Sequence, residues 1–456
     1  MKKTIIASLL VLGFSVPGED DLVIRKIFDA ALNEGHAYEN LRDLCKNVGN
    51  RLTGSHGDTL AVLWSEKKLK EIGCENVLLQ PFTTNHWVRG YGDYGKIVLE
   101  NEEKAIQLLS LGSSVGTGDK GIRAKVIEID SWDDLKSRGK KVEGKIVFYN
   151  RPMNPKNVNT FESYGQSVDQ RSKGASEAAK YGAVAALVRS MTLANDHNAH
   201  TGNMNYEDGV KRIPGLAIST ADADFLHEKL QSEKSLEIEL YSYCKNLGTV
   251  ETNNVMGEIR GSTFPDEIIV VGAHLDSWDV GEGAHDDGAG VVHAMEVLNL
   301  FRQIGYKPRH TIRCVLFMNE ENGVGGGVTY ARVAEEKGEK HIAAVESDAG
   351  GFTPRGFHVD GLDGKAQKAY SRLSSWSPLF TPYNLHYFKQ SYAGTDIGPL
   401  KKNGTALFGL IPDSQRYFDY HHTMVDVFEA VNKRELELGC GSMASLVYLI
   451  DKYGIE

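Results

Sequence analysis

Apolar positions near the start of the chain recur with a helical period. Residues 24–45 and 58–73 repeat apolar side chains every three or four positions, and the second stretch ends at Gly73, a residue type that commonly caps helices. The runs at 75–84 and 95–101 are typical of strands. The first part of the chain therefore predicts two helices followed by two strands.

From about residue 254 onward, short apolar runs alternate with longer amphipathic stretches. Stretches 267–277, 311–323 and 341–351 each predict a strand that runs into a loop, whereas 288–305 and 433–454 predict helices. Strands that alternate with helices of this length indicate a mostly parallel mixed sheet flanked by helices. We therefore expect an α/β fold.

The middle of the chain differs in its composition and in the lengths of its predicted elements. Residues 111–121 form a linker-like stretch rich in Gly and Ser, and short strands around one or two helices follow it. Because 456 residues exceed the size at which a single core stops growing, two domains are expected. We predict a main domain formed by residues 19–120 and 246–456, interrupted by an inserted domain at residues 121–245.

The N-terminal segment has the layout of a secretory signal peptide. Two lysines precede about thirteen mostly apolar residues, and small and acidic residues follow. The apolar run is too short for a comfortable membrane span, and a retained N-terminal anchor is the alternative. We expect residues 1–18 to be removed and the protein to be secreted or periplasmic, with no membrane span after this removal.

Composition and charge argue against several classes of function. A formal charge of −10 without a dense Lys/Arg block argues against a general nucleic-acid surface. The five cysteines are scattered without C-x-x-C spacing, so a thiol nucleophile is not supported. The chain also lacks a Walker lysine after its Gly-rich GVGGG stretch and a G-x-S-x-G motif, which argues against a phosphate-binding loop and a serine nucleophile.

Polar residues with metal-binding chemistry gather where the predicted strands end. They are His274 and Asp276, Asp286 and Asp287, Glu320 and Glu321, Glu346 and Asp348, and, later in the chain, His421, His422 and Asp426. Ligands bind beyond the carboxyl ends of the strands in open α/β sheets, and so many converging carboxylates would repel one another without a cation. Taken alone, each residue would more often be a cap or turn residue, so the argument rests on the combination.

The residue types indicate which metal is bound. Imidazoles and carboxylates without thiolates suit Zn²⁺ in an open catalytic site, and Mn²⁺ or Co²⁺ would also fit. The number of candidate ligands predicts two ions about 3.5–4 Å apart, the spacing found in aminopeptidases and phosphatases. Asp286 could bridge the two ions.

These motifs, in this order, resemble the co-catalytic dizinc exopeptidases of the aminopeptidase type. The resemblance is carried by GAHLDS, AHDDGAG, NEENG, ESDAGG and HHTMVD, with NRLTGSHGD upstream. The inserted region resembles a protease-associated domain in GKIVFYNRP, AAKYGAVAALVRS and IPGLAIS. Longer stretches, such as LDSWDVGEGAHDDGAG and YFDYHHTMVD, are similar to the plasma glutamate carboxypeptidase group, also called carboxypeptidase Q.

The resemblance implies a set of metal ligands. His274, Asp286 and Asp348 would bind one zinc ion. Asp286 would bridge to the second ion, which Glu321 and His422 complete. His422 is preferred to its neighbour because the family's last ligand precedes an acidic residue by four positions. Two zinc ions per chain are therefore expected.

The resemblance also implies roles for residues beside the ligands. Glu320 matches the general base, and Asp276 matches the carboxylate that orients a metal-binding histidine. The family's cis peptide would fall between Asp286 and the residue after it. Three residues lie in the stretch where relatives build part of the substrate pocket: Tyr392, Thr395 and Asp396.

The reaction implied by the resemblance is peptide hydrolysis. A metal-bridging water would attack the scissile carbonyl while Glu320 takes its proton and passes it to the leaving amine. The substrates would be short peptides with free termini, most of all unblocked dipeptides, and relatives suggest a homodimer. The alternatives are an aminopeptidase acting on longer peptides, a non-catalytic receptor-like protein on the same scaffold, and a single-zinc acyl-transfer enzyme resembling glutaminyl cyclases.

Overall fold

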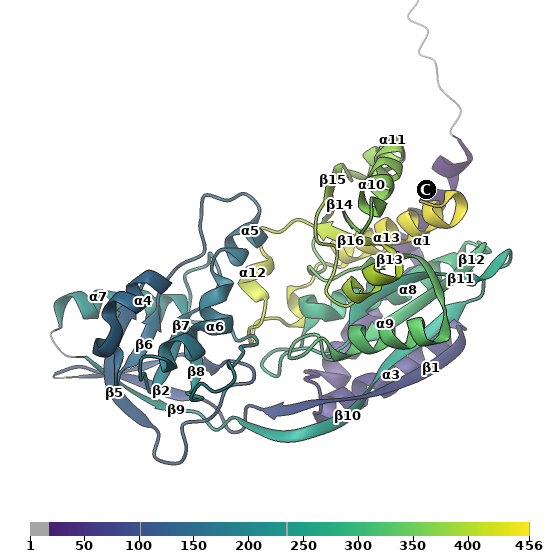
Figure 1. The fold of residues 1–456 in the computed structure, drawn as a ribbon. Coiled ribbons are helices and arrows are strands. Elements are labelled where there is room, and N and C mark those ends of the chain that lie inside the picture. Colours follow the sequence, from purple (N-terminus) through teal and green to yellow (C-terminus); the bar gives the residue numbers. More distant parts are fainter. Residues whose placement is uncertain (1–17, 101, 234–235, 456) are drawn as a thin grey trace, which may run out of the picture.

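Two bodies, each built on one eight-stranded sheet, make up the protein (Figure 1). The computed structural model describes residues 18–100, 102–233 and 236–455. The predicted signal peptide therefore lies outside the described residues, except for Gly18. Within the described ranges, no helix has the length and apolar character needed to cross a membrane.

The sheet of the larger body is mixed, with a parallel centre. Its strand order is β1-β10-β12-β11-β13-β16-β14-β15, and β12, β11, β13 and β16 pair in parallel with one another. The outer pairs β1–β10, β10–β12 and β14–β16 are antiparallel. The predicted α/β fold with a mixed sheet is confirmed. The strands are β1 (Glu75–Val88), β10 (Lys245–Ile259), β11 (Phe264–His274), β12 (His310–Phe317), β13 (Lys340–Glu346), β14 (Pro354–Asp360), β15 (Tyr387–Gln390) and β16 (Ala406–Pro412).

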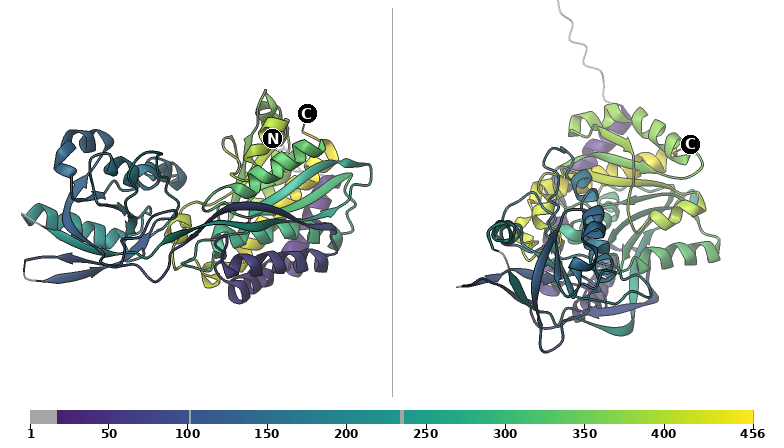
Figure 2. Two further views of the ribbon diagram at one scale, coloured as in Figure 1. Left: turned by 60° about the horizontal axis from the view of Figure 1, so that its bottom comes forward. Right: turned by 60° about the vertical axis from the view of Figure 1, so that its left-hand side comes forward.

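Helices cover both faces of this sheet (Figure 2). Side chains alternate along a strand, so Val271 of β11 faces the large helical layer while Val270 packs with Tyr330 of α9 on the opposite face. The large layer contains α1 (Glu19–Glu34), α2 (Ala37–Asp43), η1 (Leu44–Val48), α3 (His56–Ile72), α8 (Ala289–Gln303) and α13 (Lys433–Tyr453). The opposite face carries α9 (Gly325–Lys337) and η5 (Gly398–Asn403).

The remaining helical segments of this body are short or lie at its edge. Beside β14 and β15 are α10 (Lys365–Ser375), α11 (Ser377–Phe380) and η4 (Thr381–Tyr383). In the loops beyond the strands are η3 (Ala284–Gly288), α12 (Tyr417–Tyr420) and η6 (Phe428–Ala430).

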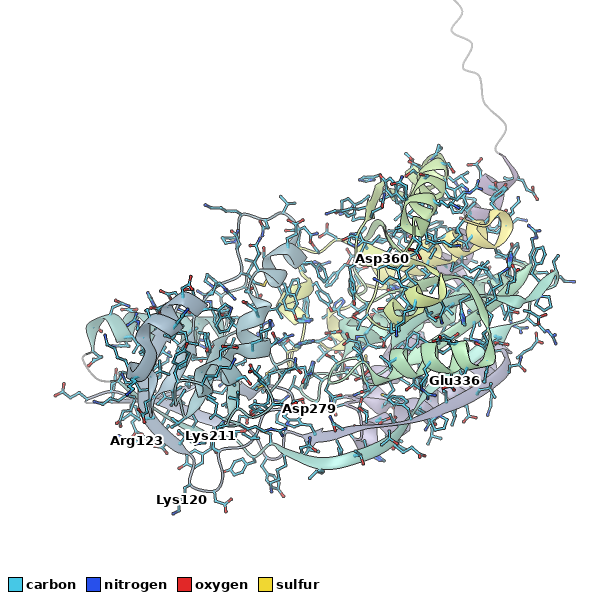
Figure 3. The ribbon with its side chains drawn as sticks, viewed as in Figure 1. Lys120, Arg123, Lys211, Asp279, Glu336 and Asp360 are labelled. Atoms are coloured by element: carbon cyan, nitrogen blue, oxygen red, sulfur yellow. The ribbon has the colours of Figure 1, made fainter. Side chains whose placement is uncertain are left out.

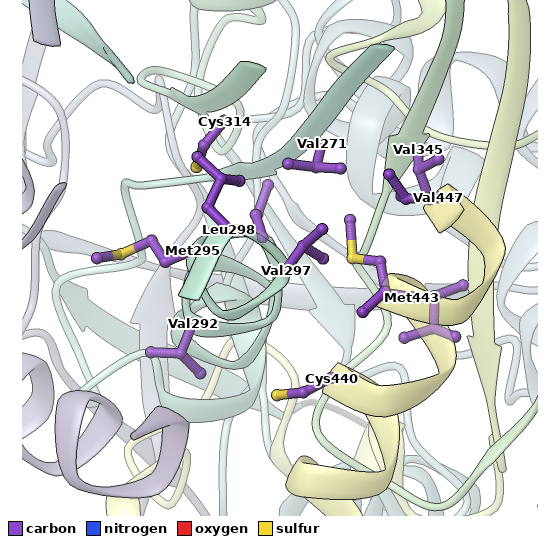
Figure 4. Close-up of a cluster of buried hydrophobic side chains, with 14 of the residues drawn as sticks. Val271, Val292, Met295, Val297, Leu298, Cys314, Val345, Cys440, Met443 and Val447 are labelled. Carbon is purple, nitrogen blue, oxygen red and sulfur yellow. The ribbon is translucent and has the colours of Figure 1, made fainter. Parts of the chain in front are cut away.

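The core of the larger body lies between α8, α13 and the central strands (Figure 4). The side chains drawn there are apolar and almost completely removed from water, and such burial is the main stabilising contribution to a fold of this kind. The helical contributions are Val292, Met295, Val297, Leu298, Cys440, Met443 and Val447, and the strand contributions are Val271, Cys314 and Val345.

The smaller body is inserted between β1 and β10. Its strand order is β3-β2-β9-β5-β6-β7-β8-β4, with separate apolar clusters on the two faces of the sheet. The strands are β2 (Tyr94–Val98), β3 (Glu103–Ile106), β4 (Leu108–Ser110), β5 (Ile122–Ile129), β6 (Ile146–Tyr149), β7 (Ala185–Arg189), β8 (Gly215–Ile218) and β9 (Glu237–Tyr241). The helical segments are α4 (Trp132–Arg138), η2 (Gly139–Val142), α5 (Thr160–Gly165), α6 (Val168–Ala179) and α7 (Thr220–Ser232).

The inserted body begins earlier than the sequence predicts. Its sheet starts at Tyr94 with β2, so the predicted start at residue 121 is wrong. The Gly/Ser stretch that resembles a linker is part of this body, because the Leu111 N–H donates to the Gly215 carbonyl and the Gly112 N–H donates to the Gly202 carbonyl. Gly112 is required for a packing reason, since a Cβ there would lie 2.1 Å from the Trp278 ring.

Arg89 ties the inserted body to the larger one at the end of β1. Its guanidinium donates to the Asp279 carboxylate at 2.7 Å and to the Thr201 hydroxyl at 3.3 Å. Asp279 lies at the junction of the two bodies (Figure 3). Because Thr201 belongs to the insert and Asp279 to the loop after β11, one buried cation fixes both segments.

A buried carboxyl group in α8 provides a test of this packing. Glu296 is 1% exposed and accepts hydrogen bonds from the His36 N–H and the Asn299 amide. Burial, reinforced by the charge of Glu437, raises the pKa of Glu296 from 4.5 to about 7. A carboxyl group with a raised pKa in the folded state contributes stability below its unfolded pKa, and that contribution is lost as the pH rises through the folded value.

We therefore expect Glu296→Gln, which keeps an acceptor oxygen but does not titrate, to gain stability relative to the wild type as the pH rises. The relative gain in free energy of unfolding between pH 4.5 and pH 8 should be roughly 3 kcal/mol. Urea denaturation across this pH range measures it, with Glu335→Gln, at an exposed position of α9, as the control. A difference between Glu296→Gln and wild type that does not change with pH would contradict the account.

Candidate active site

Three parallel strands bring candidate ligands to one edge of the sheet. His274 is the last residue of β11, Glu320 and Glu321 follow the end of β12, and Asp348 follows the end of β13. Since β11 pairs in parallel with both β12 and β13, the three carboxyl ends lie together. The sequence-predicted clustering at this edge is therefore observed.

The Asp286 carboxylate lies between two imidazole rings. Its Oδ1 is 3.2 Å from His274 Nε2, and its Oδ2 is 3.2 Å from His422 Nε2. Each ring has one further carboxylate, because Asp348 Oδ1 is 3.4 Å from His274 Nε2 and Glu321 Oε2 is 3.1 Å from His422 Nε2. The arrangement is symmetrical about Asp286, with one imidazole and one terminal carboxylate on each side.

His421 lies near the same carboxylate but fits less well. Its Nε2 is 3.8 Å from Asp286 Oδ2, and its ring stacks on that of His422 with centroids 3.5 Å apart. Burial and the neighbouring His422 charge hold the pKa of His421 well below its usual range. The geometry therefore supports the choice of His422 as the ligand.

Backbone hydrogen bonds to two aspartates hold the Asp286 turn in place. The Asp426 carboxylate accepts from the His285 N–H at 2.7 Å and from the Asp286 N–H at 3.1 Å. The Asp287 carboxylate accepts from the His274 N–H at 3.2 Å, which links the turn to the end of β11. The peptide bond between Asp286 and Asp287 is cis, as the resemblance predicted.

The second nitrogen of each imidazole contacts a backbone carbonyl. His274 Nδ1 is 3.1 Å from the Asp276 carbonyl oxygen, and His422 Nδ1 is 3.3 Å from the Thr201 carbonyl oxygen. A carbonyl oxygen can only accept, so each Nδ1 carries a proton. In the neutral form of each ring, Nε2 then has a lone pair available for a metal ion.

The Asp276 carboxylate has a different task from the predicted one. It lies 3.8 Å from His274 Nδ1, farther than the Asp276 carbonyl that orients this ring. Instead, its two oxygens accept from the backbone N–H groups of Glu320 at 3.0 Å and Glu321 at 3.2 Å. Asp276 is thus a positioning residue for the two adjacent glutamates.

The two glutamates are distinct in the structure. Glu321 is buried and contacts His422, whereas Glu320 is partly exposed. Among the residues that the structure describes, none forms a hydrogen bond or ion pair with the Glu320 carboxylate. Glu321 is therefore placed to bind a metal ion, and Glu320 is free to face a water molecule or a substrate.

The excess of negative charge shifts the pKa values of these groups. Burial alone would lower the pKa of His422, but the Glu321 charge and the Asp286 contact raise it to about 9. Desolvation raises the pKa of Glu320 to about 8, with His274 opposing it and Asp348 adding to it. Burial and the Asp286 charge raise the pKa of Glu321 to about 7. Divalent cations would relieve this mutual repulsion.

The donor set fits divalent metal ions. Three groups of residues each bring imidazole nitrogens and carboxylate oxygens within 4.8 Å of one another: Asp286, His421 and His422; His274, Asp287 and Asp348; and His274, Asp286 and Glu321. The buried Glu321 Oε1 and Asp286 Oδ2 have no hydrogen-bond partner, although buried carboxylate oxygens normally have one. Imidazole and carboxylate ligands without thiolates suit zinc.

The predicted substrate residues lie on one loop but do not share one environment. The Tyr392 hydroxyl donates to the Thr395 hydroxyl at 2.7 Å, and Tyr392 is 59% exposed. The Glu346 carboxylate accepts from the Thr395 and Ile397 N–H groups, both at 2.8 Å, and so anchors this loop to the end of β13. Asp396, by contrast, is fully buried, and neither of its carboxylate oxygens has a hydrogen-bond partner among the described residues. The sequence motif does not show that its side chain turns inward.

Three residues at the site were not found from the sequence. Arg51 is fully buried, and its guanidinium donates to the carbonyls of Leu275, Glu282 and Gly283, which shapes the loop after β11. Thr201 and Arg171 come from the inserted body and contact His422. Arg51 lies in the NRLTGSHGD motif and Thr201 in HTGNMNYEDG, but only the fold shows that these segments meet His274 or His422.

The fold and this histidine–carboxylate cleft define a metallopeptidase, and comparison with known proteins gives the family. The profile of peptidase family M28 matches residues 254–444. Carboxypeptidase Q of Bos taurus is 34% identical over 417 residues, covering 91% of this chain and 85% of that protein, and the Homo sapiens protein of the same name is 33% identical over the same length. The chain belongs to peptidase family M28.

Solved structures agree with this assignment. A peptidase M28 precursor from Shewanella amazonensis has a TM-score of 0.89 and 33% identity, covering 95% of this chain and 96% of that one. A zinc aminopeptidase from Bacillus subtilis has a TM-score of 0.64 and 19% identity, covering 91% and 94% of the two chains. The second likeness supports the fold alone.

The position of Asp276 generates a prediction. Asp276→Asn keeps the size of the side chain but leaves only one oxygen to accept two backbone N–H bonds. We expect zinc affinity, turnover or both to fall by about 10- to 100-fold, because the backbone of both glutamates is held less firmly. Competition with a chromophoric chelator measures the affinity, and peptide hydrolysis measures the turnover.

A matched control is available in the inserted body. Asp222 is also buried and accepts a backbone N–H, from Gln107 at 2.9 Å, but it lies away from the cleft. Asp222→Asn should therefore leave zinc affinity and turnover unchanged in the folded protein. Unchanged affinity and turnover in Asp276→Asn would show that the carboxylate does not position the glutamates.

Proposed function

We propose that this metallopeptidase is a zinc exopeptidase that hydrolyses short peptides with free termini, above all unblocked dipeptides. The observation that carries the proposal is the Asp286 carboxylate, shared between His274 and His422, with Asp348 and Glu321 as the outer carboxylates. One imidazole and one terminal carboxylate on each side of a shared carboxylate suit a pair of zinc ions. The similarity to carboxypeptidase Q supports the same reading.

The chain's own residues can carry out the proton transfers of peptide hydrolysis. When bound, zinc supplies Lewis-acid activation of the scissile carbonyl and of the attacking water. Glu320 takes a proton from the attacking water while the water oxygen bonds to the carbonyl carbon. Glu320 then delivers this proton to the leaving amine when the C–N bond breaks. Asp276 holds the Glu320 backbone during both transfers.

The environment of the cleft favours a free N-terminus. A protonated amine is a cation, and acidic side chains at the strand ends that are not assigned to the metal ions, such as Glu320, can attract it. Acetylation removes this charge, so a blocked peptide loses that attraction. Exopeptidase action is the expected consequence.

The remaining parts of the proposal concern the rest of the chain. We infer that the inserted body is a protease-associated domain and that the protein reaches the cell exterior or the periplasm through its N-terminal segment. The sequence motifs GKIVFYNRP and IPGLAIS support the first inference, and the layout of residues 1–18 supports the second. The homodimer stays a prediction.

A metal-depletion experiment tests the proposed function. Dialysis against a chelator should abolish dipeptide hydrolysis, and zinc should restore it. In the restored enzyme, free dipeptides should be cleaved at least about 10-fold faster than N-acetylated dipeptides, because one charged contact is lost. The matched control is Glu320→Gln, purified in the same way, which should bind zinc and show almost no turnover.

Three results would contradict parts of the proposal. Hydrolysis that survives chelation would exclude the metal mechanism. Equal cleavage of free and acetylated dipeptides would exclude exopeptidase action. Faster cleavage of longer peptides than of dipeptides would favour the alternative, an aminopeptidase of broader length range.

A further inference from the structure

The indole N–H of Trp278 is a buried donor beside the candidate metal ligands. Trp278 lies in the loop after β11 and is 3% exposed, and its Nε1 is buried without a hydrogen-bond partner among the described residues. Buried N–H groups in proteins nearly always have a partner, because an unpaired one loses its hydrogen bonds to water without compensation. The question is therefore which acceptor this N–H is placed to reach.

Residues of both bodies hold the indole ring in one orientation. The ring packs in an apolar cluster with Leu52, Trp87 and Cys244, and its centroid is 6.2 Å from that of Trp87. On the side of the inserted body, a Cβ at Gly112 would lie 2.1 Å from Trp278 Cη2 and 2.8 Å from Cζ3. The six-membered ring is therefore fixed against Gly112, and the nitrogen lies at the other end of the indole.

Trp278 lines a small cavity together with three candidate ligands of one metal ion. The cavity has a volume of about 10 Å³, and Asp286, Glu321 and His422 also line it. The ring of Trp278 meets the ring of His422 edge to face, with centroids 5.7 Å apart. The unpaired indole nitrogen thus belongs to a residue in direct contact with the candidate metal site.

Two buried carboxylate oxygens of residues that line this cavity also have no hydrogen-bond partner among the described residues. They are Asp286 Oδ2 and Glu321 Oε1. Asp286 Oδ2 is 3.2 Å from His422 Nε2, and Glu321 Oε2 is 3.1 Å from the same nitrogen, so these two oxygens would hold an ion at His422 Nε2. Glu321 Oε1 is then the acceptor that remains, and Trp278 Nε1 is the donor that remains.

We propose that Trp278 is a positioning residue for the metal ligand Glu321: its indole N–H donates to Glu321 Oε1, so that Oε2 alone binds the metal ion. Hydrogen bonds to ionised acceptors are the strong ones, and partners of this kind orient metal ligands. The cavity of about 10 Å³ gives the carboxylate room to turn toward the N–H or to reach it through one water molecule. Asp276 holds the backbone of Glu321, and Trp278 adds the contact that holds its side chain.

This inference rests on the proposed pair of zinc ions and does not depend on which peptides are cleaved. Its first test is zinc affinity, measured by competition with a chromophoric chelator in proteins that lack the Trp278 N–H. Benzothienylalanine at this position keeps the two fused rings and replaces only the N–H group by sulfur, whereas Trp278→Phe also removes part of the ring. Both proteins should bind one of the two zinc ions about 10- to 100-fold more weakly and the other ion as the wild type does.

Trp87→Phe is the matched control. Trp87 belongs to the same apolar cluster and is 2% exposed, but its Nε1 already donates to the Ser114 carbonyl at 2.9 Å. Removing that N–H should leave both zinc affinities unchanged. Wild-type affinities in the benzothienylalanine protein, or equal losses in Trp278→Phe and Trp87→Phe, would overturn the proposal.

A double-mutant cycle shows whether Trp278 acts through Glu321. Glu321→Ala removes the acceptor and should itself weaken the binding of one zinc ion. In this background Trp278→Phe should cause no further loss of zinc affinity, because the two residues act as a pair. A further loss as large as the one in the wild-type background would assign the effect to packing and reject the role.

The indole proton provides a readout without turnover. The chain has five tryptophans, so labelling them with ¹⁵N should give five indole signals in an NMR spectrum, and Trp278→Phe and Trp87→Phe assign two of these signals. Zinc loading should move the Trp278 proton signal downfield, because the N–H gains a charged acceptor, and leave the Trp87 signal in place. A Trp278 signal that moves no more than the Trp87 signal would contradict the hydrogen bond.

Zinc binding also separates this inference from the proposed function. A wild type that binds no zinc would reject the proposed function and this inference with it. Normal zinc affinity and dipeptide hydrolysis in the benzothienylalanine protein would reject the role of Trp278 alone.

Discussion

The repulsion among buried carboxylates at the carboxyl ends of β11, β12 and β13 is the constraint on which the rest of the structure depends. These strands are fixed in parallel by an apolar core, so the acidic residues that follow them cannot separate. Two imidazoles share the Asp286 carboxylate, and each also contacts an outer carboxylate. Only cations, either protons or metal ions, make such a group of charges stable away from water. The site is therefore built to bind positive charge.

Much of the surrounding structure keeps this charged group in one geometry. Asp276, Asp426 and Glu346 each use a carboxylate to accept two backbone N–H groups of neighbouring loops. Arg51 does the opposite, donating to carbonyls of the loop after β11. Carboxylates at this site therefore serve two purposes: some are candidate metal ligands, and others accept hydrogen bonds that hold the loops. This explains why so many acidic residues lie near the site while few of them are candidate ligands.

The inserted body is part of the active site and not an attachment to it. Its Thr201 carbonyl sets the proton position of His422, and its Arg171 brings a buried guanidinium to the same ring. Arg89 and Asp279 link the two bodies beside these residues. The larger body alone would keep the candidate ligands but would lose the carbonyl that contacts His422 Nδ1. Both bodies therefore contribute groups to the candidate site.

The sequence was sufficient for the central part of the fold and for the gathering of candidate ligands at one edge of the sheet, for a physical reason. Continuous apolar runs predicted β11, β12 and β13, and parallel pairing then brought His274, Glu321 and Asp348 together. Features that depend on distant contacts were not predictable. The Gly/Ser stretch at 111–121 resembles a linker until its hydrogen bonds to Gly202 and Gly215 are seen, and the inward turn of Asp396 leaves no signal in its motif.

The roles of the adjacent glutamates, Glu320 and Glu321, also could not be predicted from the local sequence. The sequence shows only two acidic residues after an apolar run, and the family resemblance alone assigned their roles. In the structure, burial and the contact with His422 distinguish Glu321, while the open carboxylate distinguishes Glu320. Three-dimensional neighbours, which no local pattern contains, separate the candidate ligand Glu321 from the candidate general base Glu320.

Anomalous diffraction at the zinc edge, from crystals of the zinc-loaded protein, tests the central claim most directly. The account predicts two anomalous peaks about 3.5–4 Å apart, one on each side of the Asp286 carboxylate, with His274 and Asp348 at one peak and His422 and Glu321 at the other. A single peak, or peaks that do not share Asp286, would contradict it.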